Sequence, residues 1–219
     1  MDLFYFDIET ISKYKNYTDF VLLDEIGANI FKRKYEKTEW KNKYESVDDC
    51  YLNTGGISPT YGKIVCISCG YFDNGEKRIS SIYSDNEIDV INKFNELLLK
   101  IEKKNFKVSG YKILTFDIPY FLHKCHSHNI TPASIILTYQ KKPWETRIID
   151  IADDIKGKMT YNFSLEELCY EFGVLNPKSI LDGSKVSETY WNGGLEKIKE
   201  YCEMDIYATM DISKIIYNL

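Results

Sequence analysis

The segment that most constrains the fold is the first one, residues 2–8, which reads DLFYFDI. Apolar side chains occupy successive positions there, so a strand formed by this segment presents apolar groups on both of its faces. Such a strand is stable only where further layers cover both sides of its sheet. The segment therefore predicts a central, doubly covered strand that ends at the acidic residues Asp7 and Glu9.

Four further segments have the composition of strands. The turn Asp73-Asn74-Gly75 is a strong hairpin signal, so the two segments that flank it should pair in antiparallel fashion. Strands that follow the first helix are expected to be parallel. The four segments are 62–72, 77–83, 106–111 and 146–151.

Helical spacing of apolar residues predicts a helix over 86–103, a second beginning near Ile118, and a long one over about 195–217. The sequence from Ser164 to Glu167 is a capping box that opens another helix, which Gly173 closes. We predict an α/β fold with a mixed five-stranded sheet flanked by helices. A chain of 219 residues fits one domain of this kind, residues 1–219, with an insertion at about 13–60.

Residues 13–60 do not follow the alternating pattern, and connections of this length are usually functional or irregular. A helix is predicted around 28–44, where basic and aromatic residues are interleaved. It could grip nucleic acid, with lysines on phosphates and rings on bases, or it could be a solvated helix that rests on its aromatic face. The basic residues are Lys32, Arg33, Lys34, Lys37, Lys41 and Lys43, and the aromatic ones are Phe31, Tyr35, Trp40 and Tyr44.

The charge and the opening of the chain narrow the class of protein. A formal net charge of −5 argues against a protein that coats nucleic acid through a broad basic surface. The first residues are acidic where a signal peptide is basic, and no apolar run approaches the roughly 18 residues of a membrane helix. We therefore expect a soluble, cytoplasmic protein with no membrane partner.

The cysteines and histidines do not predict a metal site. Cys66 and Cys69 form a CxxC within a predicted strand, where positions three apart point to opposite faces. The histidines of the segment 123–128 lack a tetrahedral ligand spacing. We interpret all six cysteines as reduced core thiols. The other four cysteines are Cys50, Cys125, Cys169 and Cys202, and the three histidines are His123, His126 and His128.

The positions of the acidic residues in two segments make them candidates for a functional site. Asp7 and Glu9 are two apart on the first strand, so both carboxylates project from one face. Asp117 follows a strand and heads a helix, where it is either a site residue or only an N-cap.

The final helix carries a carboxylate within its buried stripe. Asp205 lies at helical spacing among apolar residues, and a buried carboxylate is costly unless it is paired or bound to metal. Tyr201 lies one turn before it on the same face, and an arginine or a backbone amide is the alternative partner. Converging carboxylates suit hard cations such as Mg²⁺, and two such ions clamp a phosphodiester, so these acids predict phosphoryl-transfer hydrolysis.

Together, these motifs resemble the DEDDy group of 3′-to-5′ exonucleases. The first motif is FDIET with Asp7 and Glu9, the second is FDIP with Asp117, and the third is the YxxxD formed by Tyr201 and Asp205. The related group with a histidine in place of the tyrosine has it five residues before the last aspartate, where this chain has glutamate. The tyrosine subtype therefore fits better.

The resemblance covers residues 1–12 and 60–219, and it is strongest to stand-alone exonucleases related to the proofreading domain of family B DNA polymerases. It implies a ribonuclease-H-like fold, removal of nucleotides from a 3′ end, and two Mg²⁺ or Mn²⁺ ions. Single-stranded DNA or frayed 3′ ends would be the substrate, in proofreading or repair, with a DNA polymerase acting in trans as a partner.

The resemblance also implies a role for each acid. Asp7 would bridge both metal ions, and Glu9 and Asp205 would hold the ion that binds the attacking water. Asp117 would help to hold the other ion, and Tyr201 would orient that water or help to deprotonate it.

One departure concerns the segment before the second motif, where relatives often have an asparagine and this chain has none. Lys112 could contact a phosphate there instead. Thr10, Ile11 and Phe116 flank the acids and are candidates for contacting the terminal nucleotide.

Two other functions remain open from the sequence. An exonuclease of the ribonuclease D kind trims RNA with the same acids. No residue in the sequence is identified as one that recognises a ribose 2′-hydroxyl, so the sequence does not decide between DNA and RNA. A non-catalytic nucleic-acid-binding protein could have inherited the fold, although it would have no reason to retain all four acids and the tyrosine.

Overall fold

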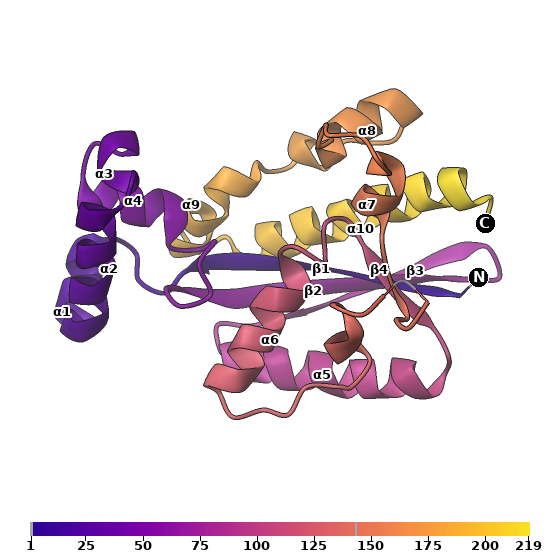
Figure 1. The fold of residues 1–219 in the computed structure, drawn as a ribbon, viewed down its shortest axis with the longest axis horizontal. Coiled ribbons are helices and arrows are strands. Elements are labelled where there is room, and N and C mark those ends of the chain that lie inside the picture. Colours follow the sequence, from indigo (N-terminus) through magenta and orange to yellow (C-terminus); the bar gives the residue numbers. More distant parts are fainter. Residues whose placement is uncertain (1, 143) are drawn as a thin grey trace.

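The computed structural model describes residues 2–142 and 144–219. Its centre is a five-stranded sheet with the order β3-β2-β1-β4-β5 (Figure 1). β1 and β2 are antiparallel, as are β2 and β3, whereas β4 is parallel to both β1 and β5. The predicted mixed five-stranded sheet is thus confirmed. The strands are β1 Leu3–Ser12, β2 Gly62–Asp73, β3 Glu76–Tyr83, β4 Lys107–Gly110 and β5 Ile148–Asp150.

Helices cover both faces of this sheet, as the apolar first strand requires (Figure 1). α5 and α6 lie on one face, and α10 crosses the other, with α7, α8 and α9 on the same side. The helices on these two faces are α5 Glu87–Lys103, α6 Asp117–Ser127, α7 Ile151–Lys156, α8 Leu165–Phe172, α9 Val186–Trp191 and α10 Leu195–Tyr217, with short 3-10 turns η1 Ile136–Thr138, η2 Pro177–Ser179 and η3 Gly183–Lys185.

Alternate residues of β1 belong to different cores. Leu3 and Tyr5 pack in the cluster beneath α10, together with residues of α8. Phe4, Phe6 and Ile8 pack in the cluster formed with α5 and α6. Because side chains alternate across a strand, β1 separates the two cores and is buried on both faces.

Local signals in the sequence predicted several element ends correctly. Asn74 and Gly75 adopt φ values of 50° and 83°, the left-handed pair that a tight hairpin turn requires. The capping box at Ser164 opens α8, and Gly173 closes it in the left-handed conformation. Among the described residues, neither α10 nor any shorter helix has the length and apolar character needed to cross a membrane.

The prediction that the first strand ends at its acids was wrong. β1 continues to Ser12, because its antiparallel pairing with β2 extends to the pair Ser12 and Gly62. The register shifts between Glu9 and Thr10, where β2 has one extra residue, Val65. Asp7 and Glu9 therefore lie within the strand, just before a β-bulge that redirects its last residues.

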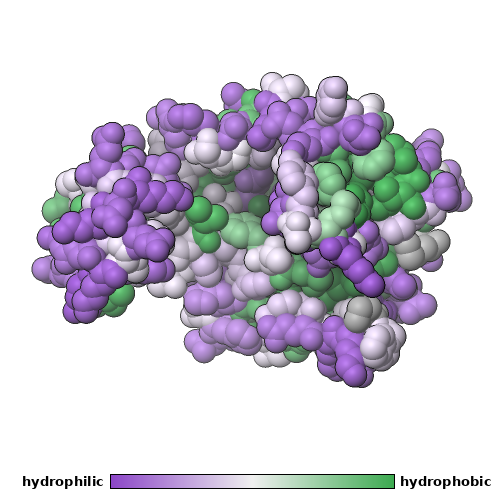
Figure 2. Space-filling model, turned by 45° about the horizontal axis from the view of Figure 1, so that its top comes forward, coloured by the Kyte–Doolittle hydropathy of each residue, from purple (hydrophilic) through white to green (hydrophobic). Residues whose placement is uncertain are grey.

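The insertion folds into four helices in a lobe at the left of Figure 1, with a largely hydrophilic surface in Figure 2. It leaves and rejoins the hairpin of β1 and β2 at one place, where the Lys13 N–H donates to the Tyr61 carbonyl over 2.9 Å. The helices are α1 Tyr17–Leu23, α2 Glu25–Lys37, α3 Trp40–Lys43 and α4 Val47–Thr54.

The single helix expected over 28–44 is divided. Thr38 is extended, with ψ 174°, which ends α2 and lets Trp40 turn back onto Phe31, with ring centroids 5.7 Å apart. The aromatic residues of the insertion pack into a cluster of their own around Phe31 and Tyr51, both 0% exposed. They are therefore engaged in packing, while the basic residues of α2 and α3 face solvent.

We predict that Phe31→Ala destabilises the insertion selectively. Removal of a fully buried phenylalanine costs about 3–5 kcal/mol, and a lobe held by one small cluster has little to offset that loss. Tryptic cleavage at the lysines of α2 and α3 should accelerate more than tenfold. Leu22→Ala, a change at a residue that is 76% exposed, serves as the matched control and should leave cleavage unchanged. Equal protease resistance of both variants would contradict an independent packing cluster.

Candidate active site

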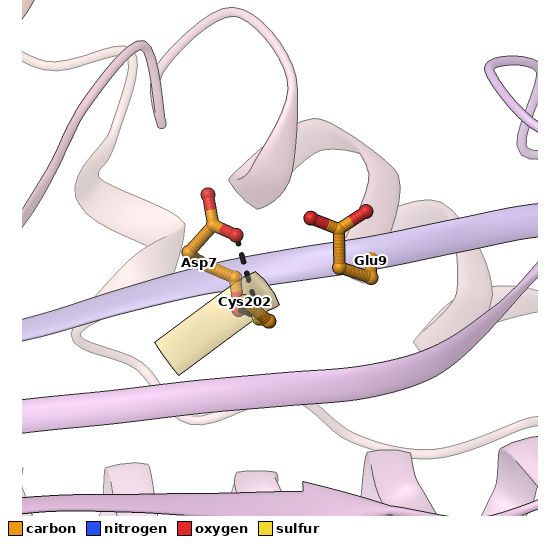
Figure 3. A group of neighbouring side chains, drawn as sticks. All are labelled: Asp7, Glu9 and Cys202. Carbon is orange, nitrogen blue, oxygen red and sulfur yellow. Dashed lines mark hydrogen bonds between the residues drawn. The ribbon is translucent and has the colours of Figure 1, made fainter. Parts of the chain in front are cut away.

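Asp7 and Glu9 lie side by side on the face of β1 that is covered by α10. Their carboxylates project from the same side of the strand, as the two-residue spacing predicted (Figure 3). The pairing of β1 with β4 reaches only Tyr5. The acidic half of β1 therefore has no strand beside it at that edge, and the sheet opens there.

Asp117 fills the opening left by the short strand β4. Its Oδ1 accepts a hydrogen bond from the backbone N–H of Ile8 over 2.9 Å, which places its carboxylate against the strand segment between Asp7 and Glu9. The N-cap residue of α6 is Phe116, and Asp117 is the first residue of that helix. Asp117 is 3% exposed and bonds across 109 positions of sequence, so its contact is tertiary and differs from that of a simple cap.

The loop that leads into Asp117 is held by Asp150, a residue that the sequence analysis did not single out. Its carboxylate accepts hydrogen bonds from the N–H groups of Lys112, Leu114 and Ala152 over 2.9, 3.0 and 3.0 Å. Lys112 adopts a φ of 60°, so this anchoring supports an otherwise unfavourable backbone conformation. The sequence feature that could have identified Asp150 is a buried strand that ends in an aspartate directly before a helix.

α10 supplies the third side of the site. Cys202 donates a hydrogen bond from Sγ to Asp7 Oδ2 over 3.4 Å (Figure 3). Asp205 follows one turn later, and Tyr201 lies on the same face and is 8% exposed. Within the described part of the chain, no arginine or backbone amide bonds to Asp205, so the alternative partners considered from sequence are not found.

Burial raises the pKa values of all four acids, and the charges of neighbouring acids add to this effect at Asp7, Glu9 and Asp117. Burial is the largest cause for Asp7 and Glu9, whose pKa values rise well above the usual range, and the charges of the other acids add to it. Burial likewise raises the pKa of Asp117 to about 7 and that of Asp205 to about 7, with the Tyr201 hydroxyl moderating the second. The four carboxylates therefore lie close enough to act as one electrostatic unit.

The Tyr201 phenol is affected in the same direction. Burial and the negative charges of Asp205, Glu9 and Asp7 raise its pKa far above that of an ordinary tyrosine. Without bound cations, Tyr201 is thus a protonated hydrogen-bond donor at neutral pH.

The donor set fits a hard divalent cation. The ligand atoms of Asp7, Glu9 and Cys202 lie within 4.8 Å of one another, a spacing that one ion could bridge, whereas Asp117 and Asp205 contribute no atom to that tight group. Burial raises the pKa of Cys202 well above its usual value, so in the metal-free protein the sulfur is a thiol, and it donates a hydrogen bond to Asp7. Carboxylate oxygens are left as donors, which Mg²⁺ and Mn²⁺ prefer to sulfur.

A hollow of about 340 Å³ opens beside Glu9. Thr10 and Phe116, two of the expected substrate contacts, line it. Ile11 is 0% exposed and packs beneath α9 and α10, so its side chain does not reach the hollow, and we no longer expect it to touch a nucleotide. Lys112 lines a different hollow, next to Asp150.

The cysteines and histidines are placed as expected from the sequence. All six cysteines are free and buried, and Cys66 and Cys69 belong to cores on opposite faces of the sheet. His128 Nε2 lies 2.9 Å from Glu87 Oε2, and the same glutamate pairs with the buried Lys124. This network joins α5 to α6 and lies apart from the four acids.

The sequence of the chain matches a known protein family. A family model described as a predicted 3′-5′ exonuclease related to the exonuclease domain of PolB matches residues 57–212. The chain belongs to this family. The matched segment of the exonuclease family includes Asp117, Tyr201 and Asp205, whereas Asp7, Glu9 and most of the insertion precede it. No curated protein sequence matches the chain.

A solved structure supports the fold of this exonuclease family member. The family B DNA polymerase from the hyperthermophilic archaeon Pyrobaculum calidifontis aligns with 99% of the chain at a TM-score of 0.62 and 15% identity. The alignment covers 24% of the polymerase, so the chain spans about a quarter of its length. The fold is therefore the ribonuclease-H-like fold expected from the sequence.

We predict that the metal-free protein loses stability as the pH rises from 5 to 8. Asp117 and Asp205 have folded-state pKa values of about 7 against an ordinary value of 3.8, so the folded chain binds more protons than the unfolded chain in this window. Their contribution is complete below about pH 4 and is lost as the pH passes through about 7. Between pH 5 and pH 8 the loss for Asp117 alone amounts to roughly 3 kcal/mol, because about two pH units separate pH 5 from its pKa of about 7, at about 1.4 kcal/mol per unit.

Urea unfolding in EDTA at both pH values measures this effect. Asp205→Asn removes one of the repelling charges, so it should raise stability by more at pH 8 than at pH 5. Glu96→Gln alters an exposed residue of α5 and is the matched control. A wild-type free energy of unfolding that is flat or rises across this range would contradict the raised pKa values.

Proposed function

We propose that this exonuclease family member hydrolyses phosphodiester bonds from the 3′ end of DNA with the help of two divalent cations, Mg²⁺ or Mn²⁺. The observation that carries the proposal is the convergence of Asp7, Glu9, Asp117 and Asp205 from β1, α6 and α10. Carboxylates that raise one another's pKa values make a metal-free site unfavourable, and cations relieve that repulsion.

The family resemblance implies a role for each acid, which we adopt in this proposal. Asp7, which lies beside Glu9 and accepts a hydrogen bond from Cys202 of α10, would help to hold both cations. Glu9 and Asp205 would hold the cation that binds the attacking water, and Asp117 would help to hold the other. Bound there, the cations supply an activated water and stabilise the leaving oxygen.

The protein's own groups position these elements. The bond from Ile8 N–H to Asp117 Oδ1 uses one carboxylate oxygen and leaves the other free for a cation. The Asp150 carboxylate holds the loop before Asp117 through three backbone bonds, which limits movement of that acid. Cys202 holds Asp7 in the same way from the side of α10.

Tyr201 would orient the attacking water. Its raised pKa favours the protonated phenol, which donates a hydrogen bond. Between the two roles considered for it, orientation is therefore better supported than deprotonation in the site as it stands.

We predict that Asp7→Ala and Asp205→Ala abolish Mg²⁺- or Mn²⁺-dependent shortening of a 5′-labelled DNA oligonucleotide. Loss of a metal ligand removes several kcal/mol of transition-state stabilisation, so rates should fall by about 1,000-fold or more. Tyr201→Phe should lower kcat by about 10- to 100-fold, since it retains the ring and removes only the hydrogen bond. A gel that resolves single-nucleotide steps shows both the rate and the 3′-to-5′ direction.

Glu203→Gln is the matched control on the same helix. Glu203 bonds to Ser81 and Lys199, away from the acids, and its variant should keep the wild-type rate. Thermal shifts with and without Mn²⁺ provide a second measurement, in which stabilisation by the cation should disappear in the Asp7→Ala variant. Full activity in either aspartate variant would overturn the proposal.

The same assay separates DNA from RNA as substrate. Matched single-stranded DNA, duplex DNA and RNA are offered with Mg²⁺ and with EDTA. Preferential degradation of RNA would replace the DNA substrate with RNA, whereas binding without degradation would favour a non-catalytic nucleic-acid-binding protein. A role in proofreading or repair, with a DNA polymerase in trans, requires that a mismatched or frayed 3′ end be degraded faster than a paired one.

A further inference from the structure

The hollow beside Glu9 continues into a second one along the insertion. The second has a volume of about 430 Å³, and it shares four lining residues with the first, so the two form one trough. We call this feature the lobe trough. The shared residues are Leu52, Asn53, Ser184 and Ser187.

The lobe trough has two walls from distant parts of the sequence. One wall is the insertion, from Lys15 and from the end of α4 to Ile57, and the other runs from Gly183 through η3 and α9. Ser12 N–H donates to Ser187 Oγ over 3.1 Å, which ties the base of the second wall to β1. Tyr120 of α6 donates to the Gly56 carbonyl over 2.9 Å, which ties down the first. The space between the walls is therefore set by direct bonds.

The near end of the lobe trough is apolar apart from the acid. Leu52 and Ile57 are 47% and 57% exposed, although both are large apolar residues at the edge of a concave surface. Phe116 lines the same hollow opposite them. An apolar surface between aliphatic and aromatic groups fits the faces of a nucleobase or a ribose.

The far end has a different chemistry. Lys15 and Lys185 line it together with Trp191. Lys185 forms an ion pair with Glu188 at 3.1 Å, but both side chains are more than 60% exposed, so this pair is weak and can yield to a phosphate. The Trp191 ring contributes an aromatic surface beside these lysines.

The different chemistry of the two ends indicates the direction in which a nucleic-acid strand would lie along the lobe trough. Acids that hold cations suit the scissile phosphate at one end, and lysines suit a phosphate further upstream at the other. Each hollow lies within the roughly 300–1,000 Å³ range of small-ligand pockets, so each can take a nucleotide-sized group.

We propose that the lobe trough binds the last nucleotides of a single-stranded 3′ end, with the terminal base against Leu52 and Ile57 and an upstream phosphate at Lys15 and Lys185. This inference rests on the proposed exonuclease activity and names the residues that hold the strand upstream of the acids. Lys15 and Leu52 of the insertion wall precede the segment 57–212 matched by the family model, whereas Ile57 and Lys185 lie within it.

The test compares two double variants with equal changes in charge. Lys15→Ala/Lys185→Ala removes the lysines of the trough, and Lys32→Ala/Lys34→Ala removes two from the exposed surface of α2. KM and kcat are measured on single-stranded DNA oligonucleotides of two to eight nucleotides in Mn²⁺. The trough variant should raise KM by about tenfold on the longer substrates, raise it less on the dinucleotide, and lower the slope of log KM against log salt by about 0.7, the value for the loss of one phosphate contact on a single strand. The α2 variant should remain within twofold of wild type.

A second pair tests the apolar end. Leu52→Ser/Ile57→Ser should raise KM on single strands by about tenfold and reduce the preference for single-stranded over blunt duplex DNA. Leu22→Ser/Leu23→Ser, on an exposed part of the insertion, is its matched control. Circular dichroism and melting temperature establish that each variant is folded.

Binding measured separately keeps the two proposals distinguishable. Fluorescence anisotropy of a 5′-labelled oligonucleotide is recorded in Ca²⁺, and a gel afterwards establishes that it is intact. Weaker binding of both trough variants supports the lobe trough even if no cleavage occurs, a result that would refute the exonuclease proposal alone. Unchanged KM and affinity in both trough variants, or equal losses in their controls, would overturn the lobe trough while leaving exonuclease activity intact.

Discussion

The site depends on the difference in length between two neighbouring strands. β1 extends to Ser12, whereas β4 ends at Gly110, so the second half of β1 has no parallel partner at that edge. An unpaired, buried N–H is costly, and the Ile8 N–H is satisfied by the Asp117 carboxylate. The same hydrogen bond thus completes the sheet and places a third acid beside Asp7 and Glu9. The Gly110 position permits this arrangement, since a Cβ there would lie 2.7 Å from the Phe6 carbonyl oxygen.

The convergence of acids has a cost that the rest of the fold must offset. The pKa values of Asp7, Glu9, Asp117 and Asp205 are all raised, which means that ionising them at neutral pH opposes folding. The two apolar cores on either side of β1 provide the compensating stability. The acids are attached to a central strand and a 23-residue helix rather than to loops. Rigid elements of this kind resist the separation that charge repulsion would otherwise cause.

Most of the fold could be predicted from local signals, because periodicity and capping are properties of short segments. The α10 bounds, the capping box at Ser164 and the hairpin at Asn74 needed no tertiary information. The end of β1 was missed because it is determined by pairing with β2, which lies beyond a long insertion. Asp150 was missed for the same reason, since its three backbone partners are two residues away or nearly forty. Asp205 could be found because a carboxylate within an apolar helix stripe is unusual, whereas Asp117 was assigned through the family resemblance. Ile11 was misjudged because its burial depends on packing by α9 and α10.

In the insertion, the packing of side chains distinguishes between two interpretations that the amino-acid composition alone allows. Aromatic residues interleaved with lysines fit both a nucleic-acid grip and a helix that rests on its rings. The rings pack in the insertion's own cluster around Phe31 and Tyr51, which favours the helix that rests on its rings. The lobe also begins and ends at the Lys13 and Tyr61 pair, so changes within it need not disturb the strand that carries the acids. The groups proposed for hydrolysis and those proposed for strand binding therefore lie on different parts of the chain: the acids lie on β1, α6 and α10, and the apolar wall beside them lies on the lobe.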